Sequence, residues 1–430
     1  MRYDPTLSSF DHVDHFGDSE KNVLLYSHDT FGLGHLRRNL AIAQRLLNPR
    51  GRFSVHLLTG SPVIRQWQLP KDLHVQPLPP VVKIGAERYA AREGGQCFGL
   101  VKGYREALIL KHVLRCRPDV FLVDHAPAGM NGELLSTLSL IRRELPATRI
   151  MLGLRDILDS PESVRKIWCD QDVHALLEHA YDDILVYGSR ALFDVAAGYG
   201  MSKIAAARVR YCGHVVAAPA ADTEIRTDPS PCWNRKRAAG RSVVLVTAGG
   251  GGDGFFLMDA YLRAISREQA ANFYSVIVTG PLMQADENLA LRSMADGRDD
   301  IELIDYTTDL VPSLRAADLV VAMAGYNTSA EIIAERKRAI LVPRLAPRAE
   351  QRMRAGLLAQ LGVVHTIEPG AGFVEELAAA VQAALTAPPP PASAWERLDL
   401  NGAERVSDYL DSLWSTPALA DPVRAWGNVA

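Results

Sequence analysis

A glycine-rich turn that ends in a histidine is the first candidate for chemistry. Gly32-Leu33-Gly34-His35 follows an apolar run at residues 22–27 and precedes a helical pattern. Its glycines permit a tight turn and the close approach of a ligand. We expect His35 to lie at the helix N-terminus, where the dipole disfavours the imidazolium and leaves a neutral ring that can accept a proton. A plain turn whose histidine only opens the helix fits the same pattern.

Two further positions carry candidate bases at the ends of apolar runs. Asp124 and His125 end a run at residues 119–123, and Asp156 follows another at 149–153. A carboxylate or an imidazole within ~3 Å of a hydroxyl can act as a general base. The same side chains can instead cap the following helices, and the sequence leaves both roles open.

A second glycine-rich loop separates an apolar run at residues 242–247 from a helical pattern that begins near Phe255. It contains Gly249, Gly250, Gly251 and Gly252. Successive amides in such a loop can cradle phosphate oxygens, helped by the helix dipole. The loop lacks the Lys-Ser/Thr ending of an ATP-binding P-loop. Because so many glycines are costly in folding entropy, we favour anion binding over a flexible turn.

A third segment, Ala324-Gly325-Tyr326-Asn327-Thr328-Ser329-Ala330-Glu331, follows the apolar run at 319–323. Thr328 and Glu331 have the spacing of a capping box, which is a sufficient structural explanation. A functional interpretation places a pyrophosphate on the amides at 327–329 and two ribose hydroxyls on Glu331. The basic, proline-punctuated loop at 343–352 adds Gln351, whose amide suits sugar hydroxyls.

These segments need a scaffold that brings them together. Short apolar runs alternate with helical patterns, first over residues 21–218 and again over 241–385, with a linker at 219–240. This rhythm predicts an α/β fold of two doubly wound, Rossmann-like domains. We expect the ligand in the cleft between them, beyond the carboxyl ends of the strands. Residues 1–20 are an extension. Residues 386–430 hold a proline-rich segment and a last helix, a candidate to pack back on the first domain.

Composition excludes several functional classes. The chain has 430 residues and a net charge of −3, with no basic footprint for nucleic acid. Its five cysteines form no Cys-x-x-Cys pair, which argues against a disulfide framework or a thiolate zinc site. No signal peptide and no apolar run near the ~18 residues of a membrane span are present. We expect a cytoplasmic protein, with peripheral contact at the inner membrane face and the oligomeric state left open.

Taken together, the motifs resemble those of GT-B glycosyltransferases, particularly family 28, which contains the peptidoglycan N-acetylglucosaminyltransferase. The resemblance covers most of residues 22–370. It implies that 21–218 bind the acceptor and 241–385 a nucleotide-diphosphate sugar, expected to be a UDP-sugar, with inversion and with no metal or cofactor. It also implies roles for individual residues: Glu331 at the ribose, Asn327 and Thr328 at the phosphates, Gln351 at the sugar, Tyr306 near the base, and His35 among the catalytic groups.

The chain also departs from the peptidoglycan enzymes. His35-Leu36-Arg37-Arg38 is closer to the Gly-His-x-x-Arg pattern of nucleotide-sugar hydrolases, and residues 123–129 replace an expected glycine-rich loop. We therefore predict a glycosyltransferase with an unidentified acceptor. The alternative is a hydrolase of the same fold that uses water as acceptor. A related 2-epimerase and a non-enzymatic carbohydrate-binding relative are less favoured.

Overall fold

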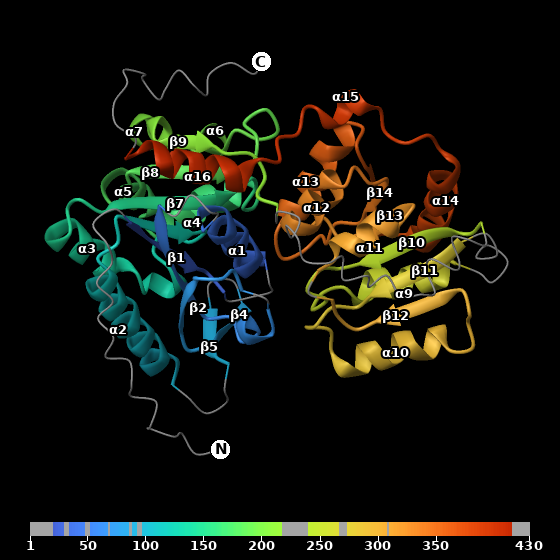
Figure 1. The fold of residues 1–430 in the computed structure, drawn as a ribbon. Coiled ribbons are helices and arrows are strands. Elements are labelled where there is room, and N and C mark those ends of the chain that lie inside the picture. Colours follow the sequence, from blue (N-terminus) through green and yellow to red (C-terminus); the bar gives the residue numbers. More distant parts are fainter. Residues whose placement is uncertain are drawn as a thin grey trace.

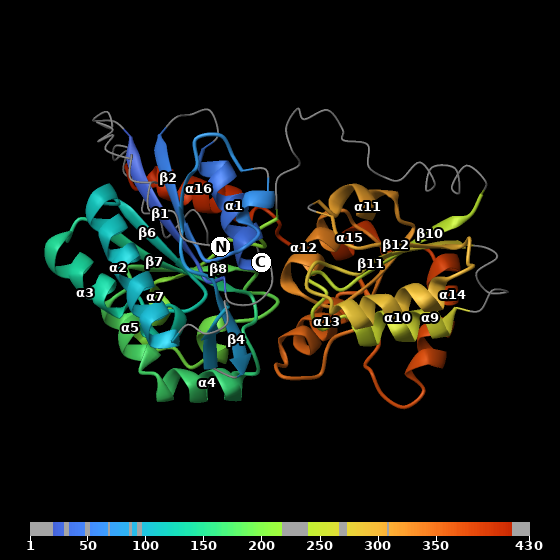
Figure 2. The same ribbon diagram turned by 90° about the horizontal axis from the view of Figure 1, so that it is seen from below.

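The computed structural model describes residues 20–29, 34–47, 52–67, 69–85, 88–92, 97–216, 240–265, 273–307 and 309–414. Gly32 and Leu33 of the first glycine turn therefore lie outside the described residues. So do almost all of the predicted extension and linker. Figures 1 and 2 show two α/β domains side by side, with the N-terminal half in blue to green and the C-terminal half in yellow to orange.

The N-terminal domain is built on a seven-stranded parallel sheet of order β3-β2-β1-β6-β7-β8-β9. An antiparallel hairpin, β4–β5, is inserted after β3. The strands are β1 (Lys21–Ser27), β2 (Phe53–Thr59), β3 (His74–Pro77), β4 (Val81–Gly85), β5 (Arg88–Ala91), β6 (Val120–Asp124), β7 (Arg149–Arg155), β8 (Asp183–Tyr187) and β9 (Val209–Tyr211).

The C-terminal domain repeats this plan in a six-stranded parallel sheet of order β12-β11-β10-β13-β14-β15. Its strands are β10 (Ser242–Thr247), β11 (Phe273–Val278), β12 (Ile301–Ile304), β13 (Leu319–Ala322), β14 (Ala339–Leu341) and β15 (His365–Thr366). In both sheets the strand order reverses beside the first strand, as in doubly wound dinucleotide-binding folds. The predicted α/β class with two Rossmann-like halves is confirmed.

Helices cover both faces of each sheet, because strands buried on two sides need apolar cover on both. Along β1, Leu24 and Tyr26 enter one core cluster while Val23 and Leu25 enter the other. The N-terminal helices are α1 (Gly34–Leu46), α2 (Phe98–Cys116), α3 (Leu135–Glu144), α4 (Pro161–Asp170), α5 (Val173–His179), α6 (Val195–Gly198) and α7 (Lys203–Ala207). The later helices are α9 (Phe255–Ala264), α10 (Ala285–Ala295), α11 (Val311–Ala316), α12 (Tyr326–Ala334), α13 (Glu350–Gln360), α14 (Phe373–Thr386), α15 (Ala392–Trp395) and α16 (Gly402–Ser412).

The last helix belongs to the first domain. Figure 1 shows α16 in red lying over the green strands of the N-terminal half. Val406 and Leu410 of α16 are buried in the cluster that contains Leu40 of α1. The Tyr409 hydroxyl donates a 2.6 Å hydrogen bond to Asp183 on β8. The candidate placement of the last helix is therefore confirmed.

Two expectations from composition can be compared with the described residues. None of the helices in these ranges is both long and apolar enough to cross a membrane. Cys97, Cys116, Cys169 and Cys212 are all free thiols, while Cys232 lies outside the described residues.

Candidate functional site

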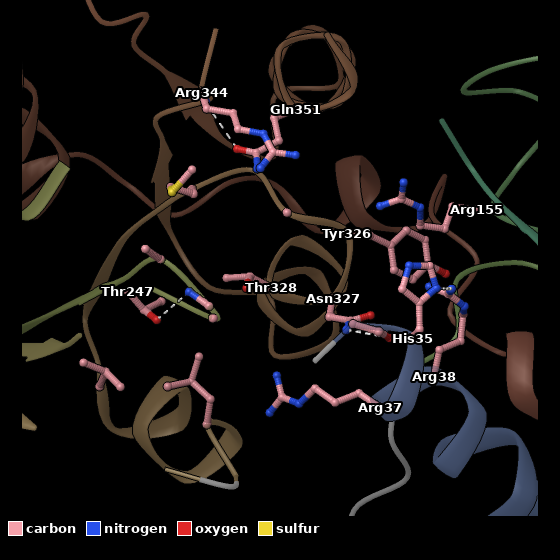
Figure 3. A pocket seen from close by; sticks show the side chains of 18 of the residues that line it. His35, Arg37, Arg38, Arg155, Thr247, Tyr326, Asn327, Thr328, Arg344 and Gln351 are labelled. Carbon is pink, nitrogen blue, oxygen red and sulfur yellow. Dashed lines mark hydrogen bonds between the residues drawn. The ribbon is translucent and has the colours of Figure 1, made fainter. Parts of the chain in front are cut away.

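A pocket lies where the central strands of the two sheets end. β1 pairs with β6 in the first domain, and β10 pairs with β13 in the second. The turns that follow these strands meet between the domains, where α1 packs against α12. Figure 3 shows the pocket, whose lining includes Gly34, His35, Arg37, Arg38, Trp67, Arg155, Thr247, Gly249, Gly250, Tyr306, Asn327, Thr328, Arg344, Glu350 and Gln351. This is the interdomain cleft expected from the sequence.

His35 stands in the first turn of α1 and is held by a buried carboxylate. Its Nδ1 lies 2.6 Å from Oδ2 of Asp124, the last residue of β6. Arg38, one turn further along α1, donates to the other carboxylate oxygen of Asp124 at 2.6 and 3.1 Å. The two sequence candidates His35 and Asp124 thus form one hydrogen-bonded group across neighbouring strand ends.

The proton on His35 can be assigned from its neighbours. Arg38 Nη2 also lies 3.0 Å from His35 Nδ1, but a guanidinium cannot accept a proton and a carboxylate cannot donate one. Nδ1–H therefore donates to Asp124, which leaves the lone pair on Nε2. Burial lowers the pKa of His35 to about 4, while Asp124 opposes this shift. Arg38 and His35 hold the pKa of Asp124 well below its ordinary value, against its burial. His35 is thus a neutral imidazole beside an ionised carboxylate.

His125 lies beside this pair together with a third histidine. The ring centroid of His125 is 5.0 Å from that of His35 and 5.6 Å from that of His28, which follows β1. His125 has a φ of +70°, a backbone conformation that is strained for a residue with a side chain. Burial and the nearby Arg155 keep its pKa well below the ordinary value. Three imidazoles therefore gather at the carboxyl ends of β1 and β6.

Asp156 makes a contact between the domains. Its two carboxylate oxygens accept hydrogen bonds from Arg354 of α13 at 2.7 and 2.9 Å. Arg354 also donates to the carbonyl of Ala324, which follows β13. Nearby, the Tyr326 hydroxyl accepts a bond from the amide of Val215. Asp156 is thus brought to the cleft edge, as expected, but its oxygens are occupied by a domain-joining ion pair.

The glycine loop after β10 divides into two parts. Gly249 and Gly250 line the pocket. Gly251 instead faces the neighbouring loop with a φ of +86°, and a Cβ there would lie 2.1 Å from the carbonyl oxygen of Thr279. Gly252 does not line the pocket. Of the four donor-binding glycines predicted in this loop, Gly249 and Gly250 therefore line the pocket, and Gly251 serves the loop's packing; Gly34, the fifth predicted donor-binding glycine, also lines the pocket.

The start of α12 corrects the predicted capping box. The helix begins at Tyr326 with Gly325 as its N-cap, so Thr328 lies inside the first turn. The backbone turns helical at Tyr326, after three residues that follow β13 and two residues before the sequence signature. The amides of Asn327 and Thr328 consequently belong to the first turn, which has no intrahelical acceptors, whereas Ser329 donates to Gly325. The Asn327 side chain donates to the carbonyl of Gly34 across the cleft at 3.2 Å.

Glu331, on the same helix, is buried against the N-terminal domain. Its Oε1 lies 3.1 Å from a guanidinium nitrogen of Arg37, which stacks over Trp67. Its Oε2 is buried and has no hydrogen-bond partner among the described residues. Burial raises the pKa of Glu331, and Arg37 opposes that shift. Glu331 thus presents one unsatisfied oxygen close to a pocket-lining arginine.

Glu331 itself does not line the pocket, whereas the remaining donor-site candidates do. Gln351 stands in the first turn of α13, where its side-chain oxygen accepts a bond from the amide of Arg344. Tyr306 lines the pocket from the segment after β12. The Arg344 guanidinium is fixed at 2.6 Å by Asp253 and by Glu350.

The charge of the pocket is strongly uneven. Four arginines line it against one carboxylate residue, Glu350; the arginines are Arg37, Arg38, Arg155 and Arg344. Guanidinium groups and helix N-termini are favoured partners for phosphate oxygens. Reasoning from sequence assigned no ligand role to these arginines. The Gly-His-x-x-Arg pattern pointed to Arg38, but nothing local marked Arg155 or Arg344. Within the described ranges, no group of three or more His, Cys, Asp or Glu residues is placed to hold a metal ion.

Comparison with solved structures defines the class of this fold. Acinetobacter baumannii MurG superposes with a TM-score of 0.55 and 14% identity, covering 91% of this chain and 99% of that one. TcCGT1, solved in complex with UDP, gives 0.61 and 14%, with coverages of 93% and 97%. A putative UDP-N-acetylglucosamine 2-epimerase from Listeria monocytogenes gives 0.59 and 14%, with coverages of 94% and 100%. The two facing Rossmann-like domains are those of the GT-B fold.

A family model matches the C-terminal half. Residues 243–408 match the model of the glycosyltransferase family 28 C-terminal domain. This half of the chain is therefore similar to family 28 glycosyltransferases, as the ordered motifs predicted. No curated protein matches it by sequence. These comparisons add no support for the hydrolase alternative.

Proposed function

We propose that the protein transfers a sugar from a UDP-sugar to an acceptor hydroxyl, with inversion at the anomeric carbon and without a metal cofactor. The observation that carries this proposal is the cationic interdomain pocket. Four arginines and the first-turn amides of α12 surround it. Such a surface suits a nucleotide diphosphate. The UDP complex of TcCGT1, which has the same fold, favours uridine as the base.

The donor is proposed to lie along the C-terminal wall. Its phosphates accept hydrogen bonds from the amides of Gly250 and Thr328, and from that of Gly249, which in this structure donates to the Thr247 hydroxyl at 3.3 Å. A ribose hydroxyl donates to Oε2 of Glu331, the buried oxygen that has no partner among the described residues. Tyr306 lies near the base and Gln351 near the sugar, both on the pocket lining.

The transfer step uses His35 as the base. Nε2 accepts the proton of the acceptor hydroxyl as that oxygen attacks the anomeric carbon. The bond between this carbon and the β-phosphate oxygen breaks on the opposite side, and UDP leaves with the bonding electrons. Asp124 stabilises the imidazolium that forms, as the carboxylate does in other hydrogen-bonded His–Asp pairs. The amides and arginines stabilise the negative charge on UDP.

Calorimetry with UDP tests the donor site directly. Glu331→Ala should weaken UDP binding at least about tenfold, because ribose hydroxyls lose a charged acceptor. His35→Ala should bind UDP within about twofold of the unaltered chain, because His35 acts on the acceptor. Wild-type affinity in Glu331→Ala would show that the donor site is wrongly assigned.

A donor incubated without acceptor separates transfer from hydrolysis. Slow release of free sugar supports a transferase, whereas rapid stoichiometric release identifies water as the acceptor. The anomeric configuration of a transferred product, read by NMR coupling constants, tests the inversion.

A further inference from the structure

The pocket contains one arginine that differs from the other three. Arg37, Arg38 and Arg344 each form an ion pair with a carboxylate. Arg155, the last residue of β7, forms no ion pair or side-chain hydrogen bond with any residue in the described ranges. Its Nε is buried without a partner. Figure 3 shows its guanidinium at the pocket, beside Tyr326.

The acidic residue next to Arg155 in the sequence does not form an ion pair with it. Asp156 follows directly in sequence, but consecutive residues at a strand end point to opposite sides. Asp156 is taken by Arg354, which binds both of its oxygens. Glu350 attracts Arg155 without forming a hydrogen bond, and its Oε1 is bound to Arg344. Arg155 therefore has a negative charge nearby, that of Glu350, but no hydrogen bond to a carboxylate of the described residues.

An uncompensated cation in this position is unfavourable in the free protein. Burial and the positive charges of Arg38, Arg354 and Arg348 together lower the pKa of Arg155 to about 10, although Glu350 opposes the shift. Holding a guanidinium away from water without a partner costs free energy. A ligand that supplies the missing negative charge removes that cost. The planar guanidinium fits two oxygens of a carboxylate or a phosphate.

The position of Arg155 indicates which part of the substrate would bring this charge. Figure 3 places Arg155 on the side of His35 and Arg38, with Thr247 of the donor wall on the opposite side. His125 lies on the same side, since its ring centroid is 5.0 Å from that of His35. Nδ1 of His125 is buried and has no partner among the residues described here. The His125 imidazole and the Arg155 guanidinium, neither of which has a hydrogen-bond partner among the described residues, therefore both lie on the side of His35.

We propose that Arg155, assisted by His125, binds an anionic group of the acceptor, a carboxylate or a phosphate, close to the hydroxyl that His35 deprotonates. This inference rests on the proposed function and adds the chemical class of the acceptor. Arg155 is a specificity-determining residue in this assignment, and the nucleotide diphosphate stays on the C-terminal wall.

The test uses inorganic phosphate as the probe and the full chain saturated with UDP, so that the donor phosphate site is filled. Calorimetry should detect phosphate binding to the wild-type complex. Arg155→Gln should weaken it at least about tenfold, because charge-assisted bonds are lost, and Arg155→Lys should weaken it less. Arg352→Gln is the matched control, since Arg352 is exposed and paired with Glu368. Its phosphate affinity should equal that of the wild type.

Two further measurements distinguish a loss of phosphate binding from misfolding and from damage to the donor site. Arg155→Gln should unfold at or above the wild-type midpoint, because no hydrogen bond is lost, so altered binding does not reflect misfolding. Its UDP affinity should stay within about twofold of wild type. A tenfold loss of UDP affinity would assign Arg155 to the donor diphosphate and overturn the proposal. Unchanged phosphate binding in Arg155→Gln would overturn it too. Absence of UDP binding in the wild type contradicts the donor site instead, and the phosphate comparison is then made without nucleotide.

Discussion

The two walls of the pocket use equivalent turns in different ways. Each follows the first strand of a doubly wound sheet and leads into a helix. On the N-terminal wall, the first turn of α1 presents side chains, and His35 is held by Asp124, which Arg38 binds in turn. On the C-terminal wall, the corresponding loop presents glycine backbone, with Gly249 and Gly250 facing the pocket.

This difference assigns proton transfer to the N-terminal wall and diphosphate binding to the C-terminal wall. A group that must gain and lose a proton depends on nearby charges, which the N-terminal wall supplies from buried side chains. Binding a diphosphate needs donors that keep their positions and do not titrate, and backbone amides meet that need. Changes on the N-terminal wall should therefore alter rate and pH dependence, and changes on the C-terminal wall should alter nucleotide affinity.

The largest expected effect is on His35. His35→Ala should lower kcat by roughly 10³-fold, because the general base is lost. Initial rates of UDP release at saturating donor measure it. Retained activity would mean that the base lies elsewhere on the N-terminal wall, with His125 the nearest candidate.

Asp124→Asn should lower kcat less than His35→Ala does, but it should also lower the stability of the fold. The amide cannot hold the imidazole with the same charge, so we expect a loss of about 10²-fold in kcat. It also leaves Arg38 unpaired in the interior, which should reduce the free energy of unfolding by about 3–5 kcal/mol. Urea denaturation measures the second effect. Glu144→Gln, which breaks an exposed pair with Arg143, is the control and should cost less than about 1 kcal/mol.

Gly251→Ala addresses the opposite wall. The new methyl group would overlap the carbonyl oxygen of Thr279 on a backbone with positive φ, so the loop must move. We expect a loss of about 1–3 kcal/mol in stability and weaker UDP binding. In Gly103→Ala, the exposed control on α2, the added Cβ meets nothing within 4 Å. That change should stabilise the helix by about 0.5–1 kcal/mol. Equal behaviour of the two variants would contradict the packing role of Gly251.

The smallest effect concerns pH. Because the pKa of His35 is lowered to about 4, the neutral base should persist to that pH, and kcat/KM should fall only below it. The unfolded chain binds this proton near pH 6.5, so between pH 6.5 and 4 it carries more protons than the folded chain. The contribution of His35 to stability is therefore present above pH 6.5 and is lost as the pH falls to about 4. Comparing urea midpoints of wild type and His35→Gln at pH 7 and pH 5 tests this sign. An acid limb near pH 6.5 in the rate profile would contradict the burial of His35.

Local patterns were sufficient to predict the scaffold. Residues 183–187, 242–247 and 301–304 are strands with the boundaries expected from their apolar runs. The short strands β3, β9 and β15 were missed because they have two to four residues and little apolar pattern. The hairpin β4–β5 was missed as well, because no helix separates its two strands and the prediction relied on strands that alternate with helices.

The candidate site was predictable only in part. His35 and Asp124 were each found because glycines or strand ends marked them, but their hydrogen bond joins positions 89 residues apart. The pairing of Asp156 with Arg354 spans 198 residues, and no local pattern carries such information. The capping-box signature at Thr328 misled because α12 already begins at Tyr326, with Gly325 as its N-cap.

The return of α16 to the first domain has a consequence for biosynthesis. Ala403, Val406, Tyr409 and Leu410 complete an apolar core whose other buried members lie before residue 216, with Tyr326 as the exception. While the chain is being translated, the N-terminal domain therefore has an uncovered apolar surface beside α1 until the last helix leaves the ribosome. The second domain is synthesised during this interval and can fold first as a unit. The first domain to be made is thus the last to be finished.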